Sequence, residues 1–425
     1  MRLPASVYVL ALTVFCLGTS EFMLAGLLPP IASDLAVSIP QAGLLISGFA
    51  LGMMLGAPVM ALLTLRLPRK VTLIGAASVF AAAHVLSATA GSFGVLMLSR
   101  VVSAVACATF WAVAAVTVVA LVPAAMTARG VAVLLAGLSI ANIIGVPLGT
   151  FVGEHLGWRG AFLAIGALTV LATLVTLWKV PETADRSHTR STREVLRAEV
   201  AGLRGRRLWV ALGTTAAFQA AVFGTFSYLA PLLTDVSGLP SAAVPLVLLA
   251  FGVGSFIGLT VGGRFADGHL LGNVAVSLVL TAASLGLLVL VSGSAVVVVV
   301  VFLFGAAAFS MASALNARVF LLAGAAPTLA SAVNVSAFNL GNSAGPWFGG
   351  RAIDVTGSYL APAAVSAALI LVALGLAGWS RRLDIGAAAT TTVAATTTDA
   401  APERPGDAVS VPAGAADRDC VGCST

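Results

Sequence analysis

The chain has 425 residues, of which 59% are hydrophobic and only 9% are charged, and its formal net charge is +6. Soluble domains carry about 25% charged residues, so this composition excludes an ordinary soluble fold and predicts a protein that crosses a membrane many times. The basic residues are not interleaved with stacking aromatics, so we expect no nucleic-acid partner.

A membrane-spanning helix needs about 20 mostly apolar residues, and the sequence contains twelve such runs between turn residues. The first run resembles a signal peptide, but it ends at Pro29 and Pro30 without an Ala-x-Ala site, so we interpret it as a retained span. The predicted fold class is an all-α membrane protein with twelve transmembrane helices. We place these helices at about residues 7–28, 41–63, 71–90, 95–121, 131–153, 160–178, 208–230, 243–263, 273–292, 295–317, 330–350 and 359–379.

The twelve spans divide six and six around an Arg-rich polar segment. We predict an N-terminal six-helix bundle at residues 1–179, a cytoplasmic linker at 180–207, a second six-helix bundle at 208–382 and a disordered cytoplasmic tail at 383–425. The tail is rich in Ala and Thr and has few large apolar residues. Its Cys420 and Cys423 are too few to close a zinc site, and we expect no metal, no cofactor and no disulfide framework.

The placement of positive charge predicts the orientation of the spans. If the N-terminus lies in the cytoplasm, nearly all of the 22 Lys and Arg residues fall on the cytoplasmic side, and the exceptions are Arg100, Arg159 and Arg351. Cytoplasmic loops of membrane proteins carry such an excess. We therefore expect a multi-pass protein of the inner (plasma) membrane with both termini in the cytoplasm.

An internal repeat relates the two bundles. Because both begin on the cytoplasmic side, it is a parallel repeat, which is typical of a two-bundle transporter with its binding site between the halves. The matching residues are Asn142, Gly145, Gly149, Glu154 and Gly157, which recur about 200 residues later as Asn342, Gly345, Gly349, Asp354 and Gly357.

Glu21 is the only acidic residue deep inside any predicted span. Ionisable groups inside a membrane are costly and are usually functional, so we interpret Glu21 as a proton-handling residue. Arg100 enters the fourth span to a matching depth and is a candidate partner. The alternatives are a structural acid held by a permanent partner and an Arg that reaches the headgroups.

Several polar and aromatic residues within the spans are candidates for a substrate cavity between the bundles. A largely neutral drug would bind to aromatic walls with a few hydrogen-bonding groups, although each residue could equally be packing. His84, in the third span, is interpreted as a structural histidine. The cavity candidates are Phe110, Trp111, Asn142, Phe218, Gln219, Phe223, Asn339 and Asn342.

Four stretches resemble the major facilitator superfamily, in its twelve-span drug:proton antiporter branch, and the general similarity is greatest to actinobacterial chloramphenicol exporters. They are the segment from Glu21 to Asp34; the loop from Gly56 to Lys70, with Arg66 and Arg69; Arg100 with the small residues after it; and the span-five motif with Gly137, Gly145, Pro147, Gly149 and Gly153. The resemblance implies proton coupling for Glu21 and Arg100, gating for the span-five motif and a cytoplasmic latch for the loop. Leu65 stands where the family usually has an Asp.

The resemblance implies proton-coupled efflux of a small amphipathic antibiotic by alternating access, and chloramphenicol is the lead candidate for that antibiotic. The expected partners are the drug, protons and the lipid bilayer, and the expected state is a monomer. We expect no enzymatic activity, because no nucleophile with a matching base occurs within the spans. One alternative is an exporter of another small metabolite, such as a sugar or amino-acid derivative. Another is a membrane sensor on the same fold that transports nothing.

Overall fold

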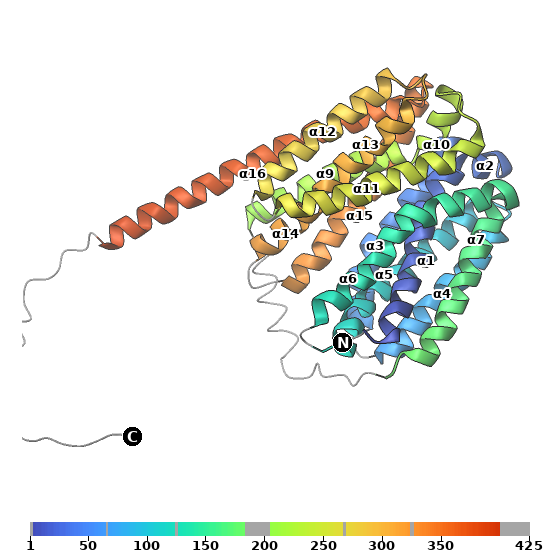
Figure 1. Cartoon of the computed structure of the whole chain (residues 1–425), viewed down its shortest axis with the longest axis horizontal. Coiled ribbons are helices and arrows are strands. Elements are labelled where there is room, and N and C mark those ends of the chain that lie inside the picture. Colours follow the sequence, from blue (N-terminus) through green and yellow to red (C-terminus); the bar gives the residue numbers. More distant parts are fainter. Residues whose placement is uncertain are drawn as a thin grey trace, which may run out of the picture. The chain divides into compact units, whose positions relative to one another are not determined.

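The computed structural model describes residues 3–64, 67–123, 126–182, 205–266, 269–323 and 327–399. Arg66, most of the predicted linker (183–204), and Cys420 and Cys423 lie outside these ranges. Residues 1–381 pack as one compact unit of helices, and residues 382–425 form a second unit (Figure 1).

The N-terminal half contains two interrupted spans, the first and the fifth. The helix α1 stops at Phe22, and α2 begins after Met23, so the first span has a break beside Glu21. The elements are α1 (Ala5–Phe22), α2 (Leu24–Asp34), α3 (Ile39–Leu63), α4 (Arg69–Ala88), α5 (Phe93–Leu121), α6 (Thr127–Ile140), the π-helix η2 (Ala141–Gly145) and α7 (Val146–Lys179).

The C-terminal half also begins with an interrupted span, but the counterpart of the N-terminal half's π-helix lies within one continuous helix. Its last helix, α16, continues through residues 383–399, which the sequence assigned to the disordered tail, and this stretch is rich in alanine, the best helix former. The elements are α9 (Arg206–Phe226), α10 (Leu229–Pro231), η3 (Leu232–Val236), η4 (Ser241–Ala243), α11 (Val244–Ala266), α12 (Leu270–Leu290), α13 (Val297–Ser310), α14 (Ala312–Ala323), α15 (Pro327–Thr356) and α16 (Ala361–Asp399).

The twelve predicted spans are all present. Ten helical segments of the described chain are long and apolar enough to cross a membrane. One of them, Arg129–Lys179, has 51 residues and holds two spans, because Gly157 turns the chain with a φ of 73°. The one remaining span, the eleventh in chain order, is α15, whose polar residues keep its hydropathy low. The predicted fold class is confirmed.

The repeat is visible in how the helices pack. In the N-terminal half, α1 packs against α6, η2 and α7, and in the C-terminal half α9 packs against α15. A Cβ atom on Gly145 would lie 2.0 Å from Thr19 Oγ1, and one on Gly345 would lie 2.4 Å from the Ala220 carbonyl oxygen. Glycines at equivalent positions therefore allow the same close approach in both halves.

The two halves meet along α3 with α15 and along α11 with η2 (Figure 1). We call the end of the bundle where α2 stops the Asp34 end, and the opposite end, where α4 begins, the Arg69 end. Ser47 donates a hydrogen bond of 2.7 Å to the Ser343 carbonyl across this junction. Nearer the Asp34 end, a Cβ atom on Gly43 would lie 2.3 Å from the Tyr228 hydroxyl. The halves are thus joined closely on the Asp34 side.

Candidate functional site

Glu21 lies in the last turn of α1, just before the break at Met23, and its side chain is half-buried. The next residue, Phe22, contacts Phe223 of α9 with ring centroids 5.5 Å apart. Glu21 is therefore close to the junction between the halves. Within the described part of the chain, its carboxylate makes no hydrogen bond or ion pair.

Arg100 is completely buried in α5 beside the same turn of α1. Its Nη1 donates to Ser20 Oγ at 3.0 Å, and its Nη2 donates to the Ser20 carbonyl at 3.3 Å. The guanidinium carbon lies 4.3 Å from the centre of the Phe49 ring. Arg100 also interacts electrostatically with Glu21. A guanidinium held in this way does not reach the headgroups, so the structure brings the two predicted ionisable residues into one site.

The glycines of the span-five motif lie against the first span. Cβ atoms on Gly137, Gly145, Gly149 and Gly153 would meet, in that order, Ala11, Thr19, Met23 and Leu27. Pro147 is the second residue of α7, just after η2, and it has no backbone N–H, so it cannot donate the hydrogen bond that a continuous α-helix would require there. The π-turn and the glycines together form a close seam along the break beside Glu21.

The cavity candidates differ in how deeply they are buried and in what they contact. Phe110 and Phe218 are fully buried within their own halves, whereas Phe223 contacts Phe22 of the other half. Trp111 and Asn142 are half-buried, and the Asn142 backbone carbonyl meets α11 at Gly252. The amides of Asn142 and Asn339 donate to carbonyls one helical turn back. The buried remainder is Gln219, Asn339 and Asn342.

The cytoplasmic loop motif is described only in part. Gly56 packs against Val105 of α5, because a Cβ atom there would lie 3.3 Å from the Val105 Cα. Arg69 is the first residue of α4, and both it and Lys70 are half-buried. Leu65 and Arg66 lie outside the described residues, so the predicted latch stays a prediction.

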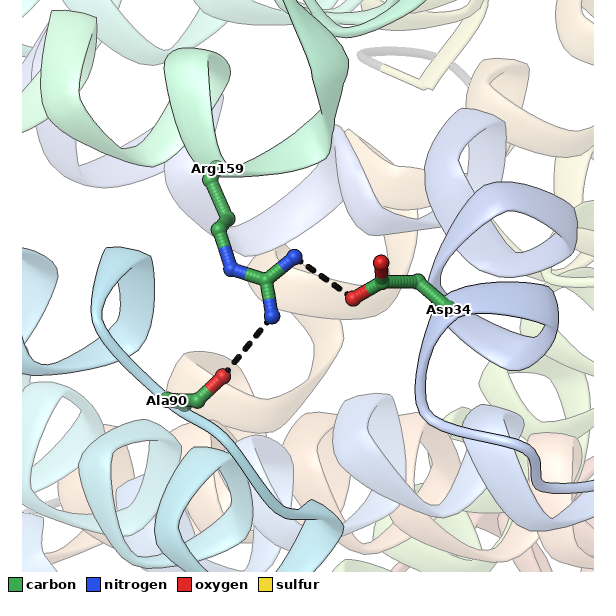
Figure 2. Close-up of polar contacts among 3 residues, drawn as sticks. All are labelled: Asp34, Ala90 and Arg159. Carbon is green, nitrogen blue, oxygen red and sulfur yellow. Dashed lines mark hydrogen bonds and ion pairs between the residues drawn. The ribbon is translucent and has the colours of Figure 1, made fainter.

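An ion pair at the Asp34 end was not expected from the sequence. Arg159 Nη1 donates to Asp34 at 2.5 Å, and Nη2 donates to the Ala90 carbonyl at 3.0 Å (Figure 2). The guanidinium also stacks on Trp158 at 4.2 Å. These contacts join α2, the α4–α5 turn and α7. The predicted topology places Asp34, Ala90 and Arg159 at the same end of the bundle, and this was the signal that could have suggested the contacts.

The C-terminal half has an acid at the equivalent place. Asp235, the penultimate residue of η3, lies about 200 residues after Asp34, and Tyr359 occupies the place of Arg159. Burial raises the pKa of the Tyr359 phenol, and the nearby charge of Asp235 raises it further. At equivalent positions the N-terminal half therefore has an Asp–Arg ion pair, whereas the C-terminal half has an Asp and a Tyr.

Sequence reasoning missed Ser20, Phe22 and Phe49 as neighbours of the ionisable pair. It placed His84 in the third span as a structural residue, and both of its ring nitrogens are hydrogen-bonded. The available signal was that Ser20 and His84 are polar residues inside apolar runs.

Comparison with known proteins supports one family. Residues 10–346 match the model of the Major Facilitator Superfamily. The chain is 41% identical over 374 residues to the chloramphenicol resistance protein of Streptomyces lividans, which covers 88% of this chain and 95% of that protein. It is 36% identical over 358 residues to the inner membrane transport protein YdhP of Escherichia coli K12, with 83% and 90% covered.

The fold also matches a solved transporter. The crystal structure of a bacterial homolog of the human lysosomal transporter Spinster, inward-facing and unoccupied, superimposes with a TM-score of 0.71 at 19% identity. The match covers 90% of this chain and 98% of that chain.

Proposed function

The chain belongs to the major facilitator superfamily, and from that membership we propose that it exports a small amphipathic antibiotic in exchange for protons. The lead candidate for that antibiotic is chloramphenicol. The similarity to a chloramphenicol resistance protein supports the substrate. The position of Glu21 supports the coupling. We propose further that the protein works as a monomer in the plasma membrane and that the Arg69 end faces the cytoplasm, because positive residues gather there.

One observation carries the coupling assignment. The Glu21 carboxylate makes no hydrogen bond or ion pair with the described residues, yet it interacts electrostatically with the completely buried guanidinium of Arg100. The Arg100 Nε–H likewise has no acceptor within the described structure. A carboxylate and a donor that are unpaired but adjacent can form a bond in one state of the transporter and lose it in another.

The transport cycle follows from this pair. The close contacts of Gly43 and Ser47 with the other half support a resting state that is closed at the Asp34 end. The drug would enter between the halves from the Arg69 end. After the halves rock and the drug leaves, Glu21 takes up a proton from outside. Protonation removes its attraction for Arg100, and release of the proton on the cytoplasmic side restores it.

Inverted membrane vesicles test the proposal directly. With an acidic lumen, wild-type vesicles should accumulate radiolabelled chloramphenicol, and an uncoupler should abolish this uptake. Glu21→Gln removes the exchangeable proton with little change in size, so pH-driven uptake should fall by about 100-fold. Glu154→Gln is the matched control, because Glu154 is exposed near the Asp34 end of the bundle, and uptake by this variant should stay at the wild-type level.

Two outcomes would contradict different parts of the proposal. Full pH-driven uptake by Glu21→Gln would remove the coupling assignment. No uptake by the wild type, with no gain in chloramphenicol tolerance in a host that lacks efflux pumps, would remove the substrate. A panel of other antibiotics, sugars and amino-acid derivatives in the same host would then identify the transported class.

A further inference from the structure

We infer that His84 is a positioning residue of the proposed proton site, because it fixes the Arg100 guanidinium beside Glu21 through the hydroxyl group of Ser20. The inference rests on the proposed function, in which Glu21 and Arg100 handle the proton. It assigns a role to a side chain that makes no hydrogen bond to Glu21 itself.

The hydrogen bonds run in one consistent direction. The Phe80 carbonyl can only accept, so His84 Nδ1–H donates to it at 2.8 Å. A neutral imidazole then offers Nε2 as an acceptor, and the Ser20 hydroxyl donates to it at 2.7 Å. The Arg100 guanidinium can only donate, so Ser20 Oγ accepts from it at 3.0 Å. With a neutral imidazole, every bond of this chain has one possible donor, and Ser20 is the link between the other two side chains.

The packing holds the chain in place. Ser20, His84 and Arg100 are all completely buried. The His84 ring lies 4.2 Å from the Phe80 ring and 5.7 Å from the Phe162 ring, measured between centroids. On the opposite side, Phe49 stacks on the guanidinium. The imidazole therefore has little freedom to turn away from Ser20.

The chain also fixes the backbone at the proton site. Arg100 Nη2 donates to the Ser20 carbonyl, and Ser20 immediately precedes Glu21. Helices α4 and α5 are thus both attached to the last turn of α1. Loss of the His84 acceptor would leave the Ser20 O–H group with no acceptor. The Ser20 oxygen could then turn, and the Arg100 guanidinium could shift relative to Glu21.

The titratable groups around Arg100 are few. Glu21 lies on α1, His84 on α4 and Cys107 on α5 itself, and all three interact with it electrostatically. The residues that α3 and α7 present here, Phe49 and Phe162, do not titrate. A protonated His84 would bring a second donor and a second cation to the Ser20 oxygen, so this geometry suits the neutral tautomer.

Two substitutions separate positioning from packing. The side-chain oxygen of Gln can replace Nε2 as an acceptor, so His84→Gln should keep the maximal rate of pH-driven uptake within about threefold of the wild type. His84→Leu removes the acceptor and should lower that rate by about tenfold or more, with the drug KM changed by less than about twofold. Loss in one variant and rescue in the other would identify the hydrogen bond as the cause.

The chain offers a matched control. His155 on α7 has the same local arrangement as His84, since its Nδ1 pairs with the Phe151 carbonyl and its ring lies 4.1 Å from the Phe151 ring. It is exposed and bonds to no residue of the proton site. His155→Leu should therefore leave transport unchanged. If His84→Leu fails to fold, Ser20→Ala, which breaks both links, should show the same tenfold loss.

A measurement without transport makes the two proposals separable. The protein has four histidines, so ¹⁵N-histidine labelling of the full chain in nanodiscs yields few imidazole signals, and His84→Gln identifies the relevant pair. We expect a protonated Nδ1 and an unprotonated Nε2 whose resonance shifts in both Ser20→Ala and Arg100→Lys. Normal transport by His84→Leu, or an Nε2 resonance that is insensitive to Arg100→Lys, would overturn the positioning role. If the wild type moves no drug but the Nε2 resonance shifts in both Ser20→Ala and Arg100→Lys, the proposed function is rejected and the hydrogen-bonded chain stands.

Discussion

Asp34 and Arg159, 125 residues apart in the sequence, form an ion pair that joins the end of the first span to the start of the sixth (Figure 2). Arg159 adds a hydrogen bond to the Ala90 carbonyl, so one guanidinium links three segments of the N-terminal half. The side chains are 40% and 44% exposed. Solvent therefore screens the pair, and its stabilisation is modest.

Replacing Arg159 tests how much the Asp34–Arg159 pair stabilises the protein. Arg159→Ala should lower the free energy of unfolding by about 0.5–1 kcal/mol, measured by unfolding in mixed micelles. High salt should reduce the difference between variant and wild type, because exposed pairs are screened. The control is Arg351→Ala, whose partner Asp354 lies 3.6 Å away and whose side chain is 64% exposed. An equal loss in both variants would contradict a specific role for the Asp34 pair.

The seam between the first and fifth spans predicts a steric effect. A Cβ atom on Gly137 would lie 2.2 Å from the Ala11 carbonyl oxygen. Neither atom can avoid the other by a side-chain rotation, because the Cβ is fixed to the backbone of Gly137 and the oxygen belongs to the backbone of Ala11. Gly137→Ala should therefore push α6 from α1, lower stability by about 1–3 kcal/mol and slow drug uptake. The readouts are unfolding in mixed micelles and the inverted-vesicle assay.

A glycine in open space is the matched control. Nothing lies within 4 Å of a Cβ atom on Gly75 in α4. Gly75→Ala should be neutral or stabilise by up to about 1 kcal/mol, since alanine is the better helix former. Similar destabilisation by both substitutions would show that the close approach at Gly137 is not the cause.

The spans were predictable because the bilayer sets their length and composition. A run of about 20 apolar residues has few alternatives in a chain with 9% charged residues. The interruptions of these spans were not predictable. The helix α1 ends before Met23 and α9 ends before Ser227, although neither residue is helix-breaking and both keep right-handed helical φ and ψ angles. The packing of each span against its neighbour determines where it stops.

The candidate site was predictable in part for a similar reason. A charge inside a membrane is costly, so Glu21 and Arg100 stood out by residue type alone. Their neighbours did not. Whether Ser20 reaches His84 depends on how α1 and α4 are rotated, and a single sequence carries no such information. The contact of Phe22 with Phe223 likewise depends on how the two halves meet.

The shape of the Arg100 side chain should matter as much as its charge. Its planar guanidinium donates to both oxygens of Ser20 and stacks on Phe49. Lysine keeps the charge but loses this geometry, so Arg100→Lys should insert normally and lose about tenfold or more in pH-driven uptake. Arg129→Lys, at an exposed position in the first turn of α6, is the control and should retain most activity. Full uptake by Arg100→Lys would mean that charge alone is sufficient.

The hydrogen bond from Ser47 to the Ser343 carbonyl should hold the halves together on the Asp34 side. Ser47→Ala removes about 1 kcal/mol from that closed state, which corresponds to about a fivefold larger open population. Spin labels at exposed Thr89 and Thr356, in a cysteine-free background, would report this as a growing long-distance population in double electron–electron resonance. Ser255→Ala is the matched control, because Ser255 bonds only to the Phe251 carbonyl within α11. The same distance change in both variants would reject the contact as a determinant of closure.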